Sequence, residues 1–325
     1  MEGYSNRTDE KIPVLAVVGP TASGKSRLAA ELARKYGGEV VSADSMQIYK
    51  GMDIGTAKVT PEETLGVPHH CIDFLEPSQT FSVAEYVRMA GACIQDIYAR
   101  GKLPVLAGGT GLYVRTLLHG TQLSEGGGED SALREALREK AQREGGAALL
   151  EELRQFDPQS AERIHPNNIP RLIRAIEIYR TTGRTMTQQL EESHKIPSPY
   201  SALMLGLTFA DREKLYDRIN RRVDQMVESG LLEEARRFLE SPEEKATAMQ
   251  AIGYKELAPY FADEISLEEA VESIRRETRR YAKRQLTWFR RDPEIHWIEV
   301  DRFESWENVL GCAEQIISQE RFLTS

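Results

Sequence analysis

The segment Gly19-Pro20-Thr21-Ala22-Ser23-Gly24-Lys25-Ser26 constrains the fold of this chain more than any other stretch. It follows an apolar run at residues 14–18 and precedes a helical pattern at residues 27–36. A glycine loop of this spacing between a strand and a helix is typical of phosphate binding, because its backbone N–H groups turn inward and the helix dipole adds positive potential. We expect Lys25 to contact phosphate oxygens and the Ser26 hydroxyl to bind Mg²⁺. The sequence therefore predicts a site for a diphosphate or a triphosphate.

Strands and helices alternate up to about residue 120, which predicts an α/β fold with a P-loop NTPase-like parallel sheet core. The second expected strand, residues 39–42, leads into Asp44, and the third, residues 103–107, ends in the glycine turn 108–111. Ligands of open α/β sheets bind at the carboxyl ends of the strands, so Asp44 could face the phosphates. An aspartate at this position could instead cap a turn.

The chain changes character after the third strand. Residues 124–130 are rich in Gly and Glu and are typical of a linker, and residues 131–192 show almost no strand signal. Four helices are predicted there, at residues 132–144, 147–156, 169–182 and 185–192, with breaks at Gly145-Gly146, Pro158, Pro166 and Gly183. We therefore expect residues 1–122 to form the first part of the P-loop core, residues 123–198 an all-helical insertion domain, and residues 199–325 the rest of the core.

The last segment carries most of the basic residues that could contact a partner. Asp211 is expected to cap a helix whose three arginines, Arg218, Arg221 and Arg222, face solvent or a ligand. A longer helix is predicted from residue 267 to about 290, and residues 275–291 hold eight Lys/Arg against one acid, Glu277. The whole chain has a net charge of −9, which argues against non-specific coating of nucleic acid. A local basic stripe on an acidic protein favours a selective contact instead.

Aromatic residues lie between the basic residues of this stripe. Tyr281, Trp288 and Phe289 could stack on RNA bases, but their helical spacing favours packing in a core. Elsewhere the three cysteines form no C-x-x-C pair, and the adjacent His69-His70 is a weak metal pattern. No apolar run approaches the ~20 residues that span a bilayer, and the polar residues 1–11 do not read as a signal peptide. These features fit a protein of the reducing cytoplasm.

Several stretches together resemble the bacterial tRNA dimethylallyltransferases, and they follow one another in the order of that family over most of the chain. They are the glycine loop 19–26, Asp44-Ser45-Met46-Gln47-Ile48-Tyr49 with Gly55-Thr56-Ala57-Lys58, Pro68-His69-His70, Gly108-Gly109-Thr110-Gly111-Leu112-Tyr113, Arg174-Ala175-Ile176-Glu177, Ala251-Ile252-Gly253-Tyr254-Lys255, and 279–285 with 287–290. The chain departs from the family pattern at Asn167-Asn168-Ile169-Pro170-Arg171 and at Gly126-Gly127-Gly128.

The resemblance implies transfer of a dimethylallyl group from dimethylallyl diphosphate to N6 of the adenosine 3′ of the anticodon, in tRNAs that read codons beginning with U. It implies Mg²⁺ as cofactor, the tRNA anticodon stem-loop as partner, and a cytoplasmic monomer without a membrane. It makes Asp44 the general base, with Thr21 and Thr110 as orienting hydroxyls. The loop and Lys25 would neutralise the departing diphosphate, so the loop needs no ATP. The adenine is expected to flip out of the stacked anticodon loop.

The residues that the resemblance assigns are as follows. The expected catalytic residues are Asp44, Lys25 and Thr21, and Ser26 is the expected Mg²⁺ ligand. The expected diphosphate-binding residues are Gly19, Pro20, Thr21, Ala22, Ser23, Gly24, Lys25 and Ser26. Contact with tRNA falls to Asp44, Ser45, Met46, Gln47, Thr110, Arg134, Pro170, Arg171, Leu172, Ile173, Arg174, Gln250, Ala251, Ile252, Gly253, Tyr254, Lys255, Lys283, Arg284, Gln285, Leu286, Thr287, Trp288, Phe289 and Arg290.

Two other functions remain open at this point. A P-loop kinase for a small molecule or nucleotide would use the same glycine loop, although the third strand ends in Gly108-Gly109 and not in the usual Mg²⁺-binding aspartate. A nucleotide-gated RNA-binding module without chemistry would also fit, although Asp44 beside the loop argues against pure binding.

Overall fold

The computed structural model describes residues 11–120, 131–240 and 247–323. The linker predicted at residues 124–130 and the polar amino terminus lie outside the described residues. The chain divides into two compact units, Met1–Leu118 with Pro199–Ser325, and His119–Ser198. Each unit has its own hydrophobic clusters, and each is described by itself below.

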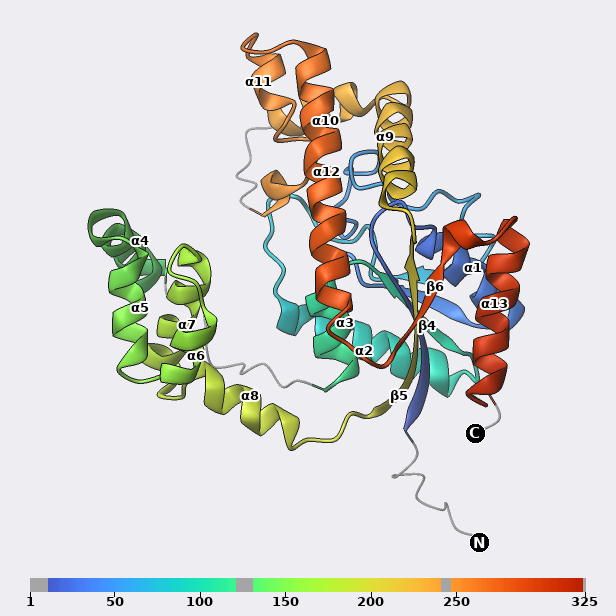
Figure 1. The fold of residues 1–325 in the computed structure, drawn as a ribbon, viewed down its shortest axis with the longest axis horizontal. Coiled ribbons are helices and arrows are strands. Elements are labelled where there is room, and N and C mark those ends of the chain that lie inside the picture. The colour runs from blue at the N-terminus through green and yellow to red at the C-terminus, as the bar shows by residue number, and fades with distance from the viewer. Residues whose placement is uncertain (1–10, 121–130, 241–246, 324–325) are drawn as a thin grey trace, which may run out of the picture. The chain divides into compact units, whose positions relative to one another are not determined.

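The first unit is built on a six-stranded sheet (Figure 1). The strands are β1 (Ile12–Val18), β2 (Glu39–Ser42), β3 (His69–His70), β4 (Pro104–Gly108), β5 (Tyr200–Thr208) and β6 (Ile295–Glu299). Their order is β3-β2-β4-β1-β5-β6, and all the pairings between them are parallel. The predicted P-loop type of parallel α/β core is therefore confirmed, and β3 and β6 are strands that the sequence analysis did not predict.

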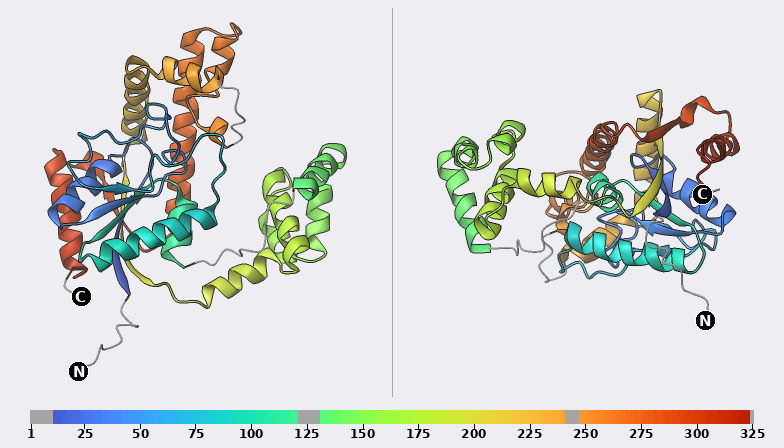
Figure 2. Two further views of the ribbon diagram at one scale, coloured as in Figure 1. Left: turned by 180° about the vertical axis from the view of Figure 1, so that it is seen from behind. Right: turned by 90° about the horizontal axis from the view of Figure 1, so that it is seen from below.

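Helices cover both faces of this sheet. The glycine-loop helix α1 (Lys25–Lys35) and α13 (Trp306–Gln319) lie on one face, and α2 (Val83–Ala99) and α3 (Gly111–Leu118) on the other (Figure 2). The side chains of β1 alternate between the two layers: Val14, Ala16 and Val18 pack with α2 and α3, while Leu15 and Val17 pack with α1. Burial on both faces explains why β1 reads as a continuous apolar run.

A further helical layer follows β5. It consists of α9 (Arg212–Glu228), α10 (Leu231–Glu240), the 3₁₀ turn η1 (Ala248–Gln250), α11 (Ala258–Phe261) and the long α12 (Leu267–Phe289). The predicted cap of α9 is confirmed, because the Asp211 carboxylate accepts the Glu213 N–H at 2.9 Å. A capping box, Ser266 with Glu269, starts α12. A second 3₁₀ turn, η2 (Val300–Arg302), leads from β6 towards α13.

The second unit is entirely helical in its described residues. It contains α4 (Ser131–Glu144), α5 (Gly146–Arg154), α6 (Pro158–Arg163), α7 (Ile169–Thr182) and α8 (Met186–His194) around a core that includes Leu137, Leu149 and Leu172. Four of these helices were predicted to within about two residues. The prediction that Pro158 breaks a helix is wrong, because Pro158 occupies the first position of α6. Asp157 caps that helix by accepting the Ser160 N–H.

Candidate active site

The glycine loop joins β1 to α1 in a tightly constrained conformation. Gly19 and Gly24 have φ angles of 148° and 97°, in the region that favours glycine. A Cβ on Gly19 would lie 2.7 Å from the Leu207 carbonyl oxygen, and one on Gly24 would lie 2.8 Å from the Trp306 ring. Both glycines are therefore required by close packing against β5 and α13 as well as by the turn.

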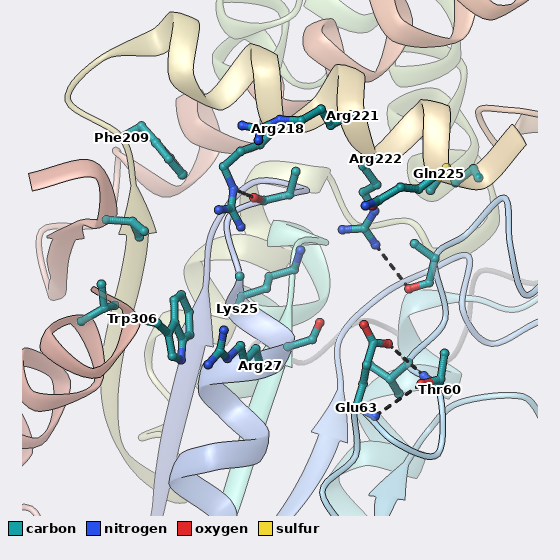
Figure 3. Close-up of a pocket in the computed structure, with 18 of the residues that line it drawn as sticks. Lys25, Arg27, Thr60, Glu63, Phe209, Arg218, Arg221, Arg222, Gln225 and Trp306 are labelled. Carbon is teal, nitrogen blue, oxygen red and sulfur yellow. Dashed lines mark hydrogen bonds between the residues drawn. The ribbon is translucent and has the colours of Figure 1, made fainter. Parts of the chain in front are cut away.

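A pocket of about 870 Å³ opens beside this loop (Figure 3). Lys25 and Ser26 line it from the start of α1, and Arg218, Arg221 and Arg222 line it from α9. In Figure 3 the guanidinium groups of Arg218 and Arg222 reach from α9 towards Lys25. Arg218 Nε donates to the Ala22 carbonyl at 2.9 Å, which ties α9 to the glycine loop. The pocket thus gathers cations from two separate elements around one space.

These cations lie in surroundings that penalise their charge. Burial lowers the pKa of Lys25 to about 8; Asp44 acts to raise that pKa, and Arg222 to lower it. Burial also lowers the pKa of Arg222, against the opposing effects of Glu63 and Asp44. Poorly solvated cations gain most from an anion, so this arrangement suits a highly charged ligand such as a diphosphate.

Asp44 lies where β2 ends, beside the glycine turn that follows β4. Its Oδ1 accepts the backbone N–H groups of Met46 at 2.9 Å and Gln47 at 3.3 Å, so the carboxylate does hold a turn. Burial lowers the pKa of Lys25 and raises that of Tyr281; the Asp44 carboxylate opposes the first shift and adds to the second, so its charge also acts on the site. The turn role and the site role, which the sequence left as alternatives, are compatible.

Thr110 joins the two strand ends. Its backbone N–H donates to the Ala43 carbonyl at 3.1 Å, and its Oγ1 accepts the Ser45 N–H at the same distance. A Cβ on Gly108 would lie 2.2 Å from the Ala43 carbonyl oxygen, so glycine allows this close approach. The structure therefore places the Thr110 hydroxyl next to the turn that Asp44 holds.

The basic stripe of α12 divides into two halves. Arg275, Arg276, Arg279 and Arg280 form ion pairs with Asp224, Glu272 and Glu277. Four later basic residues form no ion pair with another residue that the structure describes: Lys283 and Arg284 on the helix, and Arg290 and Arg291 just after its end. The second half is thus the part whose charge is available to a polyanion.

The aromatics of α12 have different surroundings. Phe289 is buried in the core, as the helical spacing favours, and Tyr281 is half-buried. Trp288 is 36% exposed, and a Cβ on Gly111 would lie 2.1 Å from its ring. Of the three, Trp288 offers the most accessible aromatic surface to a partner.

Six of the residues expected to contact tRNA have buried side chains. They are Leu172, Ile173, Ala251, Tyr254, Gln285 and Phe289. Five of those side chains pack in the hydrophobic cores of their units, and the sixth, that of Gln285, hydrogen-bonds two backbone groups of the protein. Among the residues expected to contact tRNA, those with exposed side chains remain the candidates for a direct side-chain contact. They include Arg171, Lys255, Lys283 and Arg284.

Arg134 and Arg174 support the core of the helical unit. Arg134 Nε and Arg174 Nη1 each lie 2.7 Å from the carboxylate of Glu177, which has no exposed surface. Burial raises the pKa of Glu177, but the two arginines outweigh it and hold the pKa below its ordinary value. The motif Arg174-Ala175-Ile176-Glu177 thus has a structural role inside its own unit.

Glu234 is a buried site residue that sequence reasoning missed. Its carboxylate accepts the backbone N–H groups of Asp53, Ile54 and Gly55 at 2.9 Å each, and the Tyr254 hydroxyl at 2.6 Å. It thereby fixes the segment after the Asp44 turn against the segment that follows η1. The signal was present, because Glu234 occupies a position on the apolar face of α10.

The described part of the chain contains neither a metal-binding cluster nor a membrane-spanning helix. It holds no group of three His, Cys, Asp or Glu side chains arranged to bind a metal. None of its helices combines the length and apolar character that crossing a membrane requires.

Comparisons with known proteins find two matching family models and many similar sequences. The family model described as IPP transferase matches residues 47–292, and the isopentenyl transferase model matches residues 12–73. A tRNA dimethylallyltransferase of Thermoanaerobacter sp. is 49% identical over 92% of this chain and 95% of its own length. That of Geobacillus kaustophilus is 51% identical over 90% of this chain and 91% of its own.

Solved structures of two transferases are also similar to this chain. The full-length tRNA isopentenylpyrophosphate transferase of Bacillus halodurans superposes with a TM-score of 0.68, at 43% identity, over 97% of this chain and 100% of its own. A eukaryotic dimethylallyltransferase, crystallised in snapshots of its action on tRNA, has a TM-score of 0.78 at 29% identity, over 94% of this chain and 79% of its own.

Proposed function

This chain belongs to the IPP transferase family of tRNA dimethylallyltransferases, and from that premise we propose how its residues divide the reaction. The enzyme transfers a dimethylallyl group to A37 of tRNA, the adenosine 3′ of the anticodon, with dimethylallyl diphosphate as the donor. Family membership decides against the kinase and the binding module that the sequence left open. The observation that supports our division of roles best is that the charge of Asp44 acts on Lys25 and Arg222, two of the cations that line the pocket.

The chemistry makes two demands on the protein. N6 of the adenine attacks C1 of the allyl group, the C1–O bond breaks, and the diphosphate leaves with the bonding electrons. Negative charge therefore grows on the leaving group, and N6 must lose a proton. We propose that Lys25, Arg218 and Arg222 stabilise the negative charge on the departing diphosphate with their positive charges.

We assign the role of general base, which accepts the N6 proton, to Asp44. The backbone N–H groups at residues 46 and 47 fix its carboxylate, and its charge acts on the same space as that of Lys25. A carboxylate held in this way can accept the N6 proton, and its charge also favours the developing positive charge on the allyl carbon. The Thr110 hydroxyl, bound next to this turn, is suited to orienting the amine, and Thr21 to orienting the diphosphate.

The residues present fit Mg²⁺ as a cofactor. Ser26 lines the pocket, and the charge of the Asp44 carboxylate acts on the adjacent Lys25, whereas the described residues offer no all-protein cage. Mg²⁺ prefers one or two protein oxygens together with substrate phosphates and water. When bound, the ion would neutralise part of the diphosphate charge.

We also propose which surfaces hold the RNA and which tRNAs are served. Lys283, Arg284 and Arg290 form no ion pair with any described residue, so their charge can attract RNA, and the exposed face of Trp288 offers a stacking surface. A37 must leave its stack to reach Asp44, at a cost of a few kcal/mol that these contacts can offset. The substrates are tRNAs that read codons beginning with U, and the enzyme is a cytoplasmic monomer of 36.7 kDa.

The test is a transfer assay on unmodified transcripts. Purified enzyme, dimethylallyl diphosphate and Mg²⁺ are incubated with a transcript that reads U-initial codons, and the nucleosides are analysed by mass spectrometry. We expect one N6-dimethylallyladenosine per tRNA, loss of product with a chelator, and little product from a matched transcript that reads C-initial codons. Equal modification of both transcripts would refute the codon assignment, and full activity in the chelator would refute the cofactor. Light scattering that gives twice the monomer mass would refute the monomer.

A further inference from the structure

Gln285 lies inside the protein between the two glycine turns of the site. Its side chain is 5% exposed, although it belongs to the exposed basic half of α12. Its Oε1 accepts the Thr21 backbone N–H at 2.9 Å, and its Nε2 donates to the Gly109 carbonyl at 3.0 Å. One partner can only donate and the other can only accept, so the orientation of the amide is fixed.

The second glycine turn packs closely beneath α12. A Cβ on Gly109 would lie 2.1 Å from Gln285 Nε2, and one on Gly111 equally close to the Trp288 ring. One turn earlier on the helix, Tyr281 interacts with both Thr110 and Gln285. The helix and the turn thus interlock over several residues, and the amide of Gln285 extends this contact to the diphosphate loop.

We propose that Gln285 is a positioning residue for prenyl transfer: by bridging Thr21 and Gly109, it sets the diphosphate loop at a fixed distance from the turn that carries Thr110 and adjoins Asp44. This inference rests on the proposed function. The resemblance assigned Gln285 to tRNA contact, but both ends of its amide are occupied by the protein. Small errors in the placement of two reacting groups are costly to catalysis, so a bridge of this kind acts on the chemical step.

The test uses two variants of the full-length enzyme. Gln285→Met keeps the length of the side chain and removes both hydrogen bonds, and Gln285→Asn keeps the amide but is one methylene too short to span both partners. For each we expect the Kd of inorganic pyrophosphate with Mg²⁺ to rise roughly three- to tenfold. We expect kcat, normalised to folded protein, to fall about tenfold or more. The Kd for tRNA should change less than about twofold.

Lys283→Gln, on the exposed face of the same helix, is the matched control. It should weaken tRNA binding and leave pyrophosphate binding unchanged. A Gln285 variant that changes only tRNA affinity would show an RNA contact, and one that lowers only the melting temperature would show a purely structural residue; either result overturns the inference. The proposed function fails separately, if the wild-type enzyme binds no pyrophosphate or makes no prenylated nucleoside.

Discussion

At the scale of single residues, the pocket beside the glycine loop is lined by six basic side chains and four carboxylates, so positive charge is in excess. Lys25 and Arg222 both have pKa values lowered by burial, and Asp44 only partly offsets this effect. A site of this kind is costly to keep charged while it is empty, and it recovers that cost when an anion binds. The electrostatics therefore favour tight binding of a diphosphate and give the free enzyme a pH dependence.

The first prediction concerns Lys25. Its pKa of about 8 in the folded protein means that its charge is present below pH 8 and is lost as the pH rises above that value. We expect the Kd of pyrophosphate to rise roughly tenfold between about pH 8 and pH 9.5. In Lys25→Arg the guanidinium stays charged, so the rise should be much smaller. Calorimetric titrations across this pH range measure both; parallel curves would show that Lys25 does not control binding.

The second prediction separates the two roles of Asp44. Asp44→Asn keeps an oxygen for the N–H groups of Met46 and Gln47 but cannot accept a proton. We expect kcat to fall by about 10²- to 10⁴-fold, while tRNA and pyrophosphate still bind. Single-turnover assays with excess enzyme measure the chemical step directly. If the variant kept near-normal turnover, Asp44 would be a turn residue only.

Sequence reasoning about single residues is strongest where a motif fixes both the residue type and its spacing. Lys25 and Asp44 belong to such motifs, and in the structure the charge of Asp44 acts on Lys25. Gln285 and Glu234 act through partners far away in the sequence, at separations of 264 and 181 residues. No local pattern specifies such partners, which explains why the sequence could not predict these contacts.

At the scale of elements, α12 combines a structural face and a charged face. Its first basic residues are neutralised by acids on α9 and on α12 itself, whereas those after residue 282 form no ion pair with described residues. Periodicity predicted this helix because it is long and strongly amphipathic. Periodicity did not predict β3, which has only two residues, or α6, because a proline in the first turn of a helix resembles a helix-breaking proline in the sequence. Short elements depend on tertiary pairing and caps more than on pattern.

The third prediction compares two arginines of α12. Arg284 lies over the Tyr281 ring without an ion pair among the described residues, whereas Arg276 interacts with Ser273 and Glu277. Arg284→Gln should weaken tRNA binding and reduce the salt dependence of the affinity by about one charge. Arg276→Gln removes the same charge and should change neither. Binding titrations at several salt concentrations give both slopes, and equal slopes for the two variants would contradict the proposed RNA surface.

At the scale of the whole molecule, the two compact units have separate hydrophobic cores. The core around Leu149 draws only on residues of the helical unit, and the core around Leu205 only on residues of the sheet unit. The predicted division into residues 1–122, 123–198 and 199–325 rests on the change from alternating strands and helices to helices alone. Its first boundary, at residue 122, lies outside the described part of the chain.

The fourth prediction follows from these separate cores. Leu149→Ala and Leu205→Ala each remove a side chain with no exposed surface, and each should destabilise its own unit by about 2–5 kcal/mol. We expect Leu149→Ala to speed amide hydrogen exchange in α5 and α7 while β1 and β5 keep wild-type rates, and Leu205→Ala to do the reverse. Mass spectrometry of exchanged peptides resolves both regions in the full-length protein. Faster exchange in the sheet of the Leu149 variant would mean that the helical unit and the sheet unfold together, because a shared transition spreads any loss of stability over both.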